Sequence, residues 1–217
     1  MNLIKTYGHV YDADRLSAES LIIDLGANRG IFAKEMMDLY DCSIVAFEPS
    51  RHLCENYLKK VENEYEKFSF FENAVWSERK ELELLDFADQ NGGDSGVANS
   101  IIPHKRDVRK DGRYVQEKYK VQCLTLNEIL EPYDKVDLLK IDIEGSEIEV
   151  LTKVPEDLLK KCNQVCVEFH IFSQGEYKVK LTHNDINHIV SKMNNIGFKA
   201  VQTNDKHPDI LFMRDDK

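Results

Sequence analysis

Two acidic residues stand at the ends of short apolar runs near the N-terminus, and glycines follow the first of them. The run LIIDL carries Asp24 and is followed by Gly26 and Gly30, and the run IVAF is followed by Glu48. In an α/β domain the carboxyl ends of adjacent parallel strands share one sheet edge, where ligands bind. We therefore expect Asp24, Gly26 and Glu48 to border a pocket for a nucleotide-like ligand.

The glycine spacing narrows the kind of nucleotide. A pyrophosphate-binding turn needs a second glycine two residues after the first, and Asn28 occupies that place. An NAD-dependent oxidoreductase is therefore disfavoured. Asp24 suits a positively charged ligand, and Glu48 is placed to accept hydrogen bonds from ribose hydroxyls, which together favour S-adenosylmethionine. The alternative is that Gly26 and Gly30 serve only turns and packing.

Charged residues also interrupt two later apolar runs. Lys140 and Asp142 alternate in DLLKID, and Glu168 and His170 alternate in VEFH, so each pair shares one face of an expected strand. Charges in a buried strand are costly unless they are paired. If the strands are neighbours, the four side chains converge at the same sheet edge as an active site. The alternative is a structural ion pair between Lys140 and Glu168 beside two solvated groups.

Composition limits the classes of protein that fit. The chain has 217 residues, 42% of them hydrophobic, and a formal net charge of −10, which argues against a nucleic-acid binder. Its five cysteines include no CxxC pair, so we expect reduced thiols. No apolar run approaches the ~20 residues that span a bilayer, and no signal peptide is evident, which favours a cytoplasmic protein. A basic run, Lys105–Arg113, suggests either a solvated loop or a contact with an acidic or phosphorylated substrate.

Strand-like and helix-like segments alternate along the chain, which predicts one α/β domain over residues 1–217 with a parallel sheet and helices on both faces. Seven core strands are expected, the last of them antiparallel, and a segment of about residues 81–124 is read as an inserted hairpin and loop. The expected strands are Leu21–Leu25, Ser43–Phe47, Phe68–Val75, Val136–Asp142, Gln164–His170, Phe198–Thr203 and Asp209–Arg214. The expected helices are Ile31–Tyr40, Arg51–Glu62, one opened by Gly145 and Ser146, and Thr182–Ile196.

The chain resembles the FkbM-type methyltransferases, which use S-adenosylmethionine and have the class I methyltransferase fold, a Rossmann-like sheet of seven strands. The resemblance covers about residues 20–200 and rests on the motifs DLGANRG, AFEPS, ENAVW, LTLNEI, LLKIDIEGSE and VEFH. The family mostly methylates oxygen, typically hydroxyls of sugars, glycolipids or natural products. The resemblance does not extend to the region 86–119, so it implies no particular acceptor.

Matched motif by motif, the resemblance assigns residues to parts of the cofactor. Glu48, next to Pro49, would hold the ribose, and Asn73 with Ala74 would flank the adenine. Asp142 would lie beside the methyl-donor sulfur. The residues implied around the methionine part are Asp24, Gly26, Ala27, Asn28 and Gly30.

These residues lead to a mechanistic hypothesis. A substrate hydroxyl attacks the sulfonium methyl group, with Asp142 or His170 as general base. Glu168 is expected to orient His170 or to pair with Lys140. No metal is required, although a metal-assisted variant on Asp142, Glu168 and His170 stays open. The competing class is a non-catalytic module that binds S-adenosylmethionine.

Overall fold

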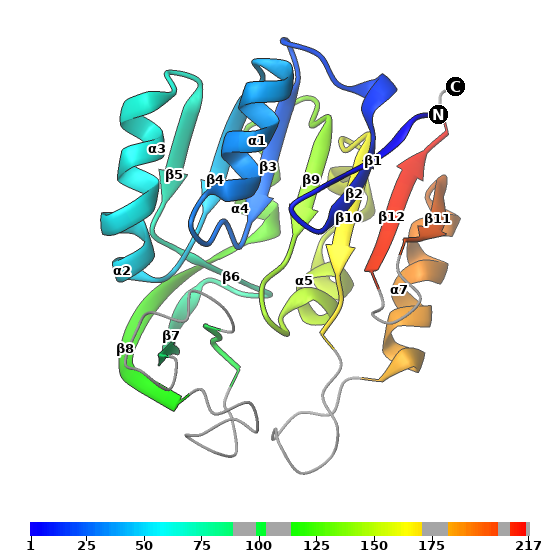
Figure 1. Cartoon of the computed structure of the whole chain (residues 1–217). Helices are drawn as coiled ribbons and strands as arrows, with labels where there is room; N and C mark the ends of the chain where they lie inside the picture. Colours follow the sequence, from blue (N-terminus) through cyan, green and yellow to red (C-terminus); the bar gives the residue numbers. More distant parts are fainter. Residues whose placement is uncertain (89–98, 103–113, 171–181, 204–208, 216–217) are drawn as a thin grey trace.

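A seven-stranded sheet forms the centre of the computed structural model, which describes residues 1–88, 99–102, 114–170, 182–203 and 209–215 (Figure 1). The strands run in the order β11-β12-β10-β9-β3-β4-β5. Their bounds are β3 Leu21–Leu25, β4 Ser43–Phe47, β5 Phe68–Phe71, β9 Leu138–Ile141, β10 Gln164–Glu168, β11 Phe198–Gln202 and β12 Asp209–Arg214. Only β12 is antiparallel to its neighbours in this sheet, as predicted.

Helices cover both faces of the sheet and enclose two apolar cores. One face packs against α1 (Ile31–Tyr40) and the continuous helical segment α2 (Arg51–Leu53), η2 (Cys54–Leu58) and α3 (Lys59–Glu64). The other face packs against α4 (Leu126–Leu130), α5 (Glu147–Lys153), α6 (Glu156–Leu159) and α7 (His183–Asn195). The apolar side chains of α1 and α7 recur at helical spacing, so each helix presents one stripe to its core.

An N-terminal hairpin that the sequence pattern did not reveal lies on the same face as α1. It consists of β1 (Leu3–Thr6) and β2 (His9–Asp12), and the short helix η1 (Ala13–Arg15) follows it. The fully buried Tyr11 joins the core beneath α1, and the backbone N–H of Asp12 donates to the side chain of Gln164, 2.7 Å away. The hairpin is thereby fixed across β10 (Figure 1).

The expected third strand, Phe68–Val75, is wrong in its second half. The chain leaves the main sheet after β5, where it makes a tight turn in which the backbone N–H of Asn73 donates to the carbonyl of Phe71. Strand β6 (Ala74–Trp76) then joins a separate sheet. That sheet has the order β6-β8-β7, and its hairpin of β7 (Lys80–Ala88) and β8 (Tyr114–Thr125) confirms the expected antiparallel pairing. The basic run Lys105–Arg113 lies outside the described residues.

The two strands that carry the second group of charges are shorter than expected. Strand β9 ends at Ile141 and β10 at Glu168, so Asp142 and His170 lie in the segments that follow their strands. All five cysteines are free and buried. Among the described residues, no helix combines the length and apolar character needed to cross a membrane.

Candidate active site

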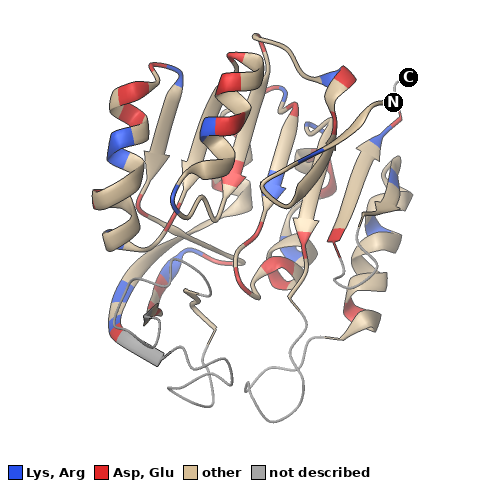
Figure 2. Ribbon diagram, viewed as in Figure 1, with Lys and Arg blue, Asp and Glu red and all other residues tan. Residues whose placement is uncertain are grey.

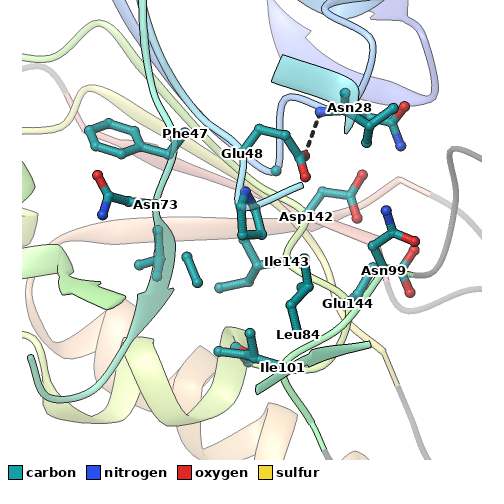
Figure 3. Close-up of a pocket in the computed structure, with 16 residues that line it drawn as sticks. Asn28, Phe47, Glu48, Asn73, Leu84, Asn99, Ile101, Asp142, Ile143 and Glu144 are labelled. Atoms are coloured by element: carbon teal, nitrogen blue, oxygen red, sulfur yellow. Dashed lines mark hydrogen bonds between the residues drawn. The ribbon is translucent and has the colours of Figure 1, made fainter. Parts of the chain in front are cut away.

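A cavity that opens to solvent lies at the carboxyl ends of β3, β4 and β9 (Figure 3). Its floor is the turn after β3 and the segment after β9, and one wall comes from the β6-β8-β7 sheet. Seven residues singled out from the sequence line it: Gly26, Asn28, Glu48, Pro49, Asn73, Ala74 and Asp142. The cavity therefore brings together the two sequence segments that were read as a nucleotide pocket.

Gly26 allows the turn after β3 to pass directly against the segment after β9. Its φ is +83°, and a Cβ built there would overlap the backbone carbonyl oxygen of Asp142. The N–H groups of Gly26 and Ala27 both donate to the carbonyl of Phe47, and the N–H of Asp142 donates to the carbonyl of Leu25. Only glycine fits this place, because a side chain would meet backbone rather than a movable neighbour.

Glu48 is held in one orientation at the edge of the cavity. Its Oε2 accepts from the backbone N–H of Asn28 at 2.9 Å (Figure 3), and its Oε1 accepts from that of Ser50 at the same distance. The side chain is 5% exposed, and burial raises its pKa to about 7. Each carboxylate oxygen keeps a second lone pair. Glu48 can therefore accept two further hydrogen bonds from a ligand that carries adjacent hydroxyls.

The opposite part of the cavity is apolar, and sequence reasoning missed most of it. Leu84 on β7, Ile101 and Ile143 line this part, near Phe47 and Asn73 (Figure 3). The alternating pattern of Glu81–Phe87 could have indicated Leu84, because it gives the strand one apolar face that must pack against the rest of the domain. An apolar slot beside one amide side chain suits a flat heteroaromatic ring.

Three predicted cofactor residues do not line the cavity. Gly30 is the N-cap of α1, and a Cβ there would meet the side chains of Leu58 and Val61, which fits the alternative of a turn and packing role. Ala27 belongs to the core on the α1 face. Asp24 is fully buried and pairs with Lys140, 2.9 Å away.

Lys140 organises this part of the sheet. Its Nζ also donates to the carbonyl of Gly26 at 2.7 Å and lies 3.8 Å from Asp142. Burial alone would lower the pKa of Lys140, but the carboxylates of Asp24 and Asp142 raise it above the ordinary value. The ion pair considered between Lys140 and Glu168 is wrong, because the buried ammonium takes its carboxylate partner from Asp24 on the adjacent strand β3.

His170 and its neighbours form a cluster beside Asp142. His170 Nδ1 lies 3.0 Å from the fully buried carboxylate of Glu147, and Nε2 lies 3.5 Å from Glu144 and 4.0 Å from Glu168. Figure 2 shows acidic positions gathered at the carboxyl ends of β9 and β10. Glu168 thus lies near His170, but the carboxylate at hydrogen-bonding distance from the ring is that of Glu147.

His9 is a member of this site that the sequence did not reveal. It comes from the N-terminal hairpin, is 6% exposed, and places Nε2 3.5 Å from Asp142 Oδ2, with its ring edge-on to Phe32. A lone histidine in an alternating segment carries no signal of its own. Only the tertiary packing of the hairpin across β10 brings it to Asp142.

The charges around Asp142 set the protonation states of the cluster. Burial would raise the pKa of Asp142, but Lys140 and the two histidines outweigh it and lower the pKa. Burial, with the charge of Asp142, raises the pKa of Glu168 to about 7. Burial would lower the pKa of His170, but Glu147 holds it well above the ordinary value. His170 is therefore charged near neutral pH, and a charged imidazole donates hydrogen bonds rather than acting as a base.

Comparison with known proteins identifies the class. A solved structure described as methyltransferase FkbM from Methylobacillus flagellatus KT matches 91% of this chain with a TM-score of 0.56 and 14% sequence identity. An rRNA methylase from Streptococcus thermophilus matches 93% of it with a TM-score of 0.50. The protein has the class I methyltransferase fold. The chain spans 44% of the Methylobacillus structure and 89% of the Streptococcus one.

The family follows from the sequence comparison. The model of the methyltransferase FkbM domain matches residues 24–200, and the chain belongs to this family. The methyltransferase sdnD of Sordaria araneosa is 27% identical over 187 residues, which cover 74% of this chain and 70% of the relative. The protein is thus a methyltransferase, and its family and fold imply a cofactor of the S-adenosylmethionine type.

Proposed function

We propose that the protein transfers the methyl group of S-adenosylmethionine to a hydroxyl of a small molecule, sugar or glycolipid. The observation that carries the proposal is the fixed, buried carboxylate of Glu48 at the edge of the cavity. Two backbone N–H groups aim it, and its remaining lone pairs match the two hydroxyls of a ribose. The membership in the FkbM family supports the same reading.

The rest of the cavity fits the other parts of this cofactor. The apolar slot of Leu84, Ile101 and Ile143 is suited to the adenine, with Asn73 able to contact its edge. Asp142 and Glu144 supply negative charge on the side where a sulfonium would lie. The absence of a Cβ at Gly26 lets the ligand approach the backbone between β3 and β9. When bound, S-adenosylmethionine supplies an electrophilic methyl group.

The chain's contribution to the reaction is to align the acceptor and remove its proton. Alignment alone is worth up to about 7–11 kcal/mol in favourable cases, and a general base adds roughly 10²–10⁴-fold. Of the two predicted bases, Asp142 lines the cavity and His170 does not. We therefore place Asp142 against the acceptor hydroxyl, with His170 as a charged neighbour that fixes the surrounding carboxylates.

A labelled-methyl transfer assay tests the proposal. The protein is incubated with radiolabelled S-adenosylmethionine and separate panels of hydroxylated sugars, glycolipids, nucleotide sugars and natural-product-like alcohols, and Glu62→Gln on α3 serves as a matched control. Transfer to an oxygen acceptor that falls in Asp142→Ala and persists in the control supports it. Transfer only to nitrogen or carbon acceptors overturns it. Preference for acidic or phosphorylated acceptors would support the role suggested for the Lys105–Arg113 run.

The second candidate is a module that binds the cofactor without transferring its methyl group. The cluster around Asp142 and His170 argues against it, because a binding role needs no such convergence of charges beside the cavity. Tight binding of S-adenosylhomocysteine without turnover of any hydroxylated acceptor would favour this candidate.

A further inference from the structure

The cluster beside the cofactor cavity has the composition of a metal site. Asp142, Glu144 and His170 each offer one ligand atom, and these atoms all lie within 4.8 Å of one another. A second set, His9, Asp142 and Glu168, meets the same condition and shares Asp142. Ligands bound to one ion at about 2.1 Å lie roughly 3–4 Å apart, which is the range of the 3.5 Å separation between His170 Nε2 and Glu144 Oε2.

His170 is oriented as a metal-binding histidine is. Its Nδ1 faces Glu147, whose Oε1 also accepts from the backbone N–H groups of Ile143 and Gly145 at 3.1 Å each. A buried carboxylate in this position fixes the proton on Nδ1 and turns Nε2 toward the other ligands, as in carboxylate–histidine–metal arrangements. This contact is independent of the three ligand atoms themselves.

The charge balance points the same way. Three carboxylates, Asp142, Glu144 and Glu168, gather around His170 Nε2, and the nearby ammonium of Lys140 lies 2.9 Å from Asp24 but 3.8 Å from Asp142. A divalent cation would displace the proton from His170 Nε2 and carry twice its charge, so it would offset the mutual repulsion of these oxygens more fully than the charged imidazole does.

We propose that Asp142, Glu144 and His170 bind one divalent cation next to the cofactor cavity. A site with mixed carboxylate and imidazole ligands suits Mn²⁺ or Zn²⁺ better than Ca²⁺, which prefers oxygen ligands alone. Asp142 and Glu144 also line the cavity, so the ion would lie where an acceptor oxygen must approach. If the proposed function holds, the bound ion would select acceptors with two neighbouring oxygens, such as a vicinal diol, because these can chelate it.

Titration with Mn²⁺ alone tests the site without the cofactor. The chelator-treated full chain is titrated by calorimetry and by the loss of the free Mn²⁺ signal in electron paramagnetic resonance. One saturable site is expected, and its affinity should fall at least about 10-fold in His170→Gln and in Glu144→Gln. His188→Gln, an exposed histidine on α7, and Glu62→Gln should bind as the unchanged protein does.

Two results would overturn the site. The first is no saturable binding of Mn²⁺ or Zn²⁺ up to on the order of 1 mM. The second is binding that both variants leave unchanged while their thermal unfolding matches the wild-type protein, which would locate the ion elsewhere. Glu147→Gln gives a further check, because losing the carboxylate behind His170 should weaken binding without removing a ligand. Failure here leaves binding of S-adenosylhomocysteine intact, so it is distinguishable from failure of the proposed function.

Discussion

Replacing Gly26 by alanine tests the close approach of backbone on which the cavity depends. Three glycines with similar positive φ provide a graded series. At Gly197, with φ +96°, an added Cβ meets nothing within 4 Å. At Gly30, with φ +72°, it lies 3.0 Å from the side chains of Leu58 and Val61. At Gly26, with φ +83°, it overlaps backbone.

The magnitudes follow from these surroundings. The left-handed backbone alone costs a non-glycine residue roughly 1–2 kcal/mol, which is the expectation for Gly197→Ala. Overpacking adds roughly 1–3 kcal/mol where neighbours cannot move, so Gly26→Ala should lose about 2–5 kcal/mol and Gly30→Ala an intermediate amount. For a domain of this size 1 kcal/mol corresponds to roughly 2–4 °C in melting temperature.

Urea unfolding measures the order of stability of the three variants, and calorimetry measures their affinity for S-adenosylhomocysteine. Gly26→Ala should also lose cofactor affinity, because Gly26 and Asp142 both line the cavity, whereas Gly197→Ala should keep it. If Gly26→Ala unfolds no more easily than Gly197→Ala, the predicted contact with Asp142 is wrong.

Further predictions concern the buried charges. The pKa of Glu48 rises from 4.5 to about 7 on folding, so the stability linked to its proton is complete below pH 4.5 and lost as the pH rises through 7. From pH 5 to pH 8, the free energy of unfolding of the wild-type protein should fall by up to roughly 3 kcal/mol more than that of Glu48→Gln. Equal pH profiles of the two proteins in urea unfolding would contradict this. Lys140→Met should destabilise the protein by about 3–5 kcal/mol, because it leaves Asp24 charged and unpaired, and the added change Asp24→Asn should recover part of that loss in urea unfolding. Asp142→Asn should lower the rate of methyl transfer by roughly 10²-fold or more, and a full rate in single-turnover assays would exclude it as base.

The main sheet followed from sequence because its signals are local. Apolar runs bounded by glycine and polar residues predicted the seven strands, and helical spacing predicted α1 and α7. The split after Phe71 was missed because β5 and β6 read as one apolar run. The separation of β6 from β5 depends on the turn at Asn73 and on the pairing of β6 with β8, which lies far along the chain.

The site was predicted in part for the same reason. Glu48 and Asp142 follow strands and so were found from strand ends. The partner of Lys140 was missed because register across β3 and β9 selects Asp24, which no local pattern reveals. His9 depends on how the N-terminal hairpin packs on β10. Pairing across distant elements was therefore the information that the sequence pattern lacked.

The binding of S-adenosylhomocysteine to the wild-type protein and to Glu48→Gln, measured by calorimetry with Glu62→Gln as control, tests the central claim most directly. Hydrogen bonds to a charged group are worth about 1.5–3 kcal/mol, so the account predicts saturable binding that weakens roughly 10-fold or more in Glu48→Gln and is unchanged in the control. Absence of binding to the wild-type protein, or equal affinity in Glu48→Gln, would contradict it.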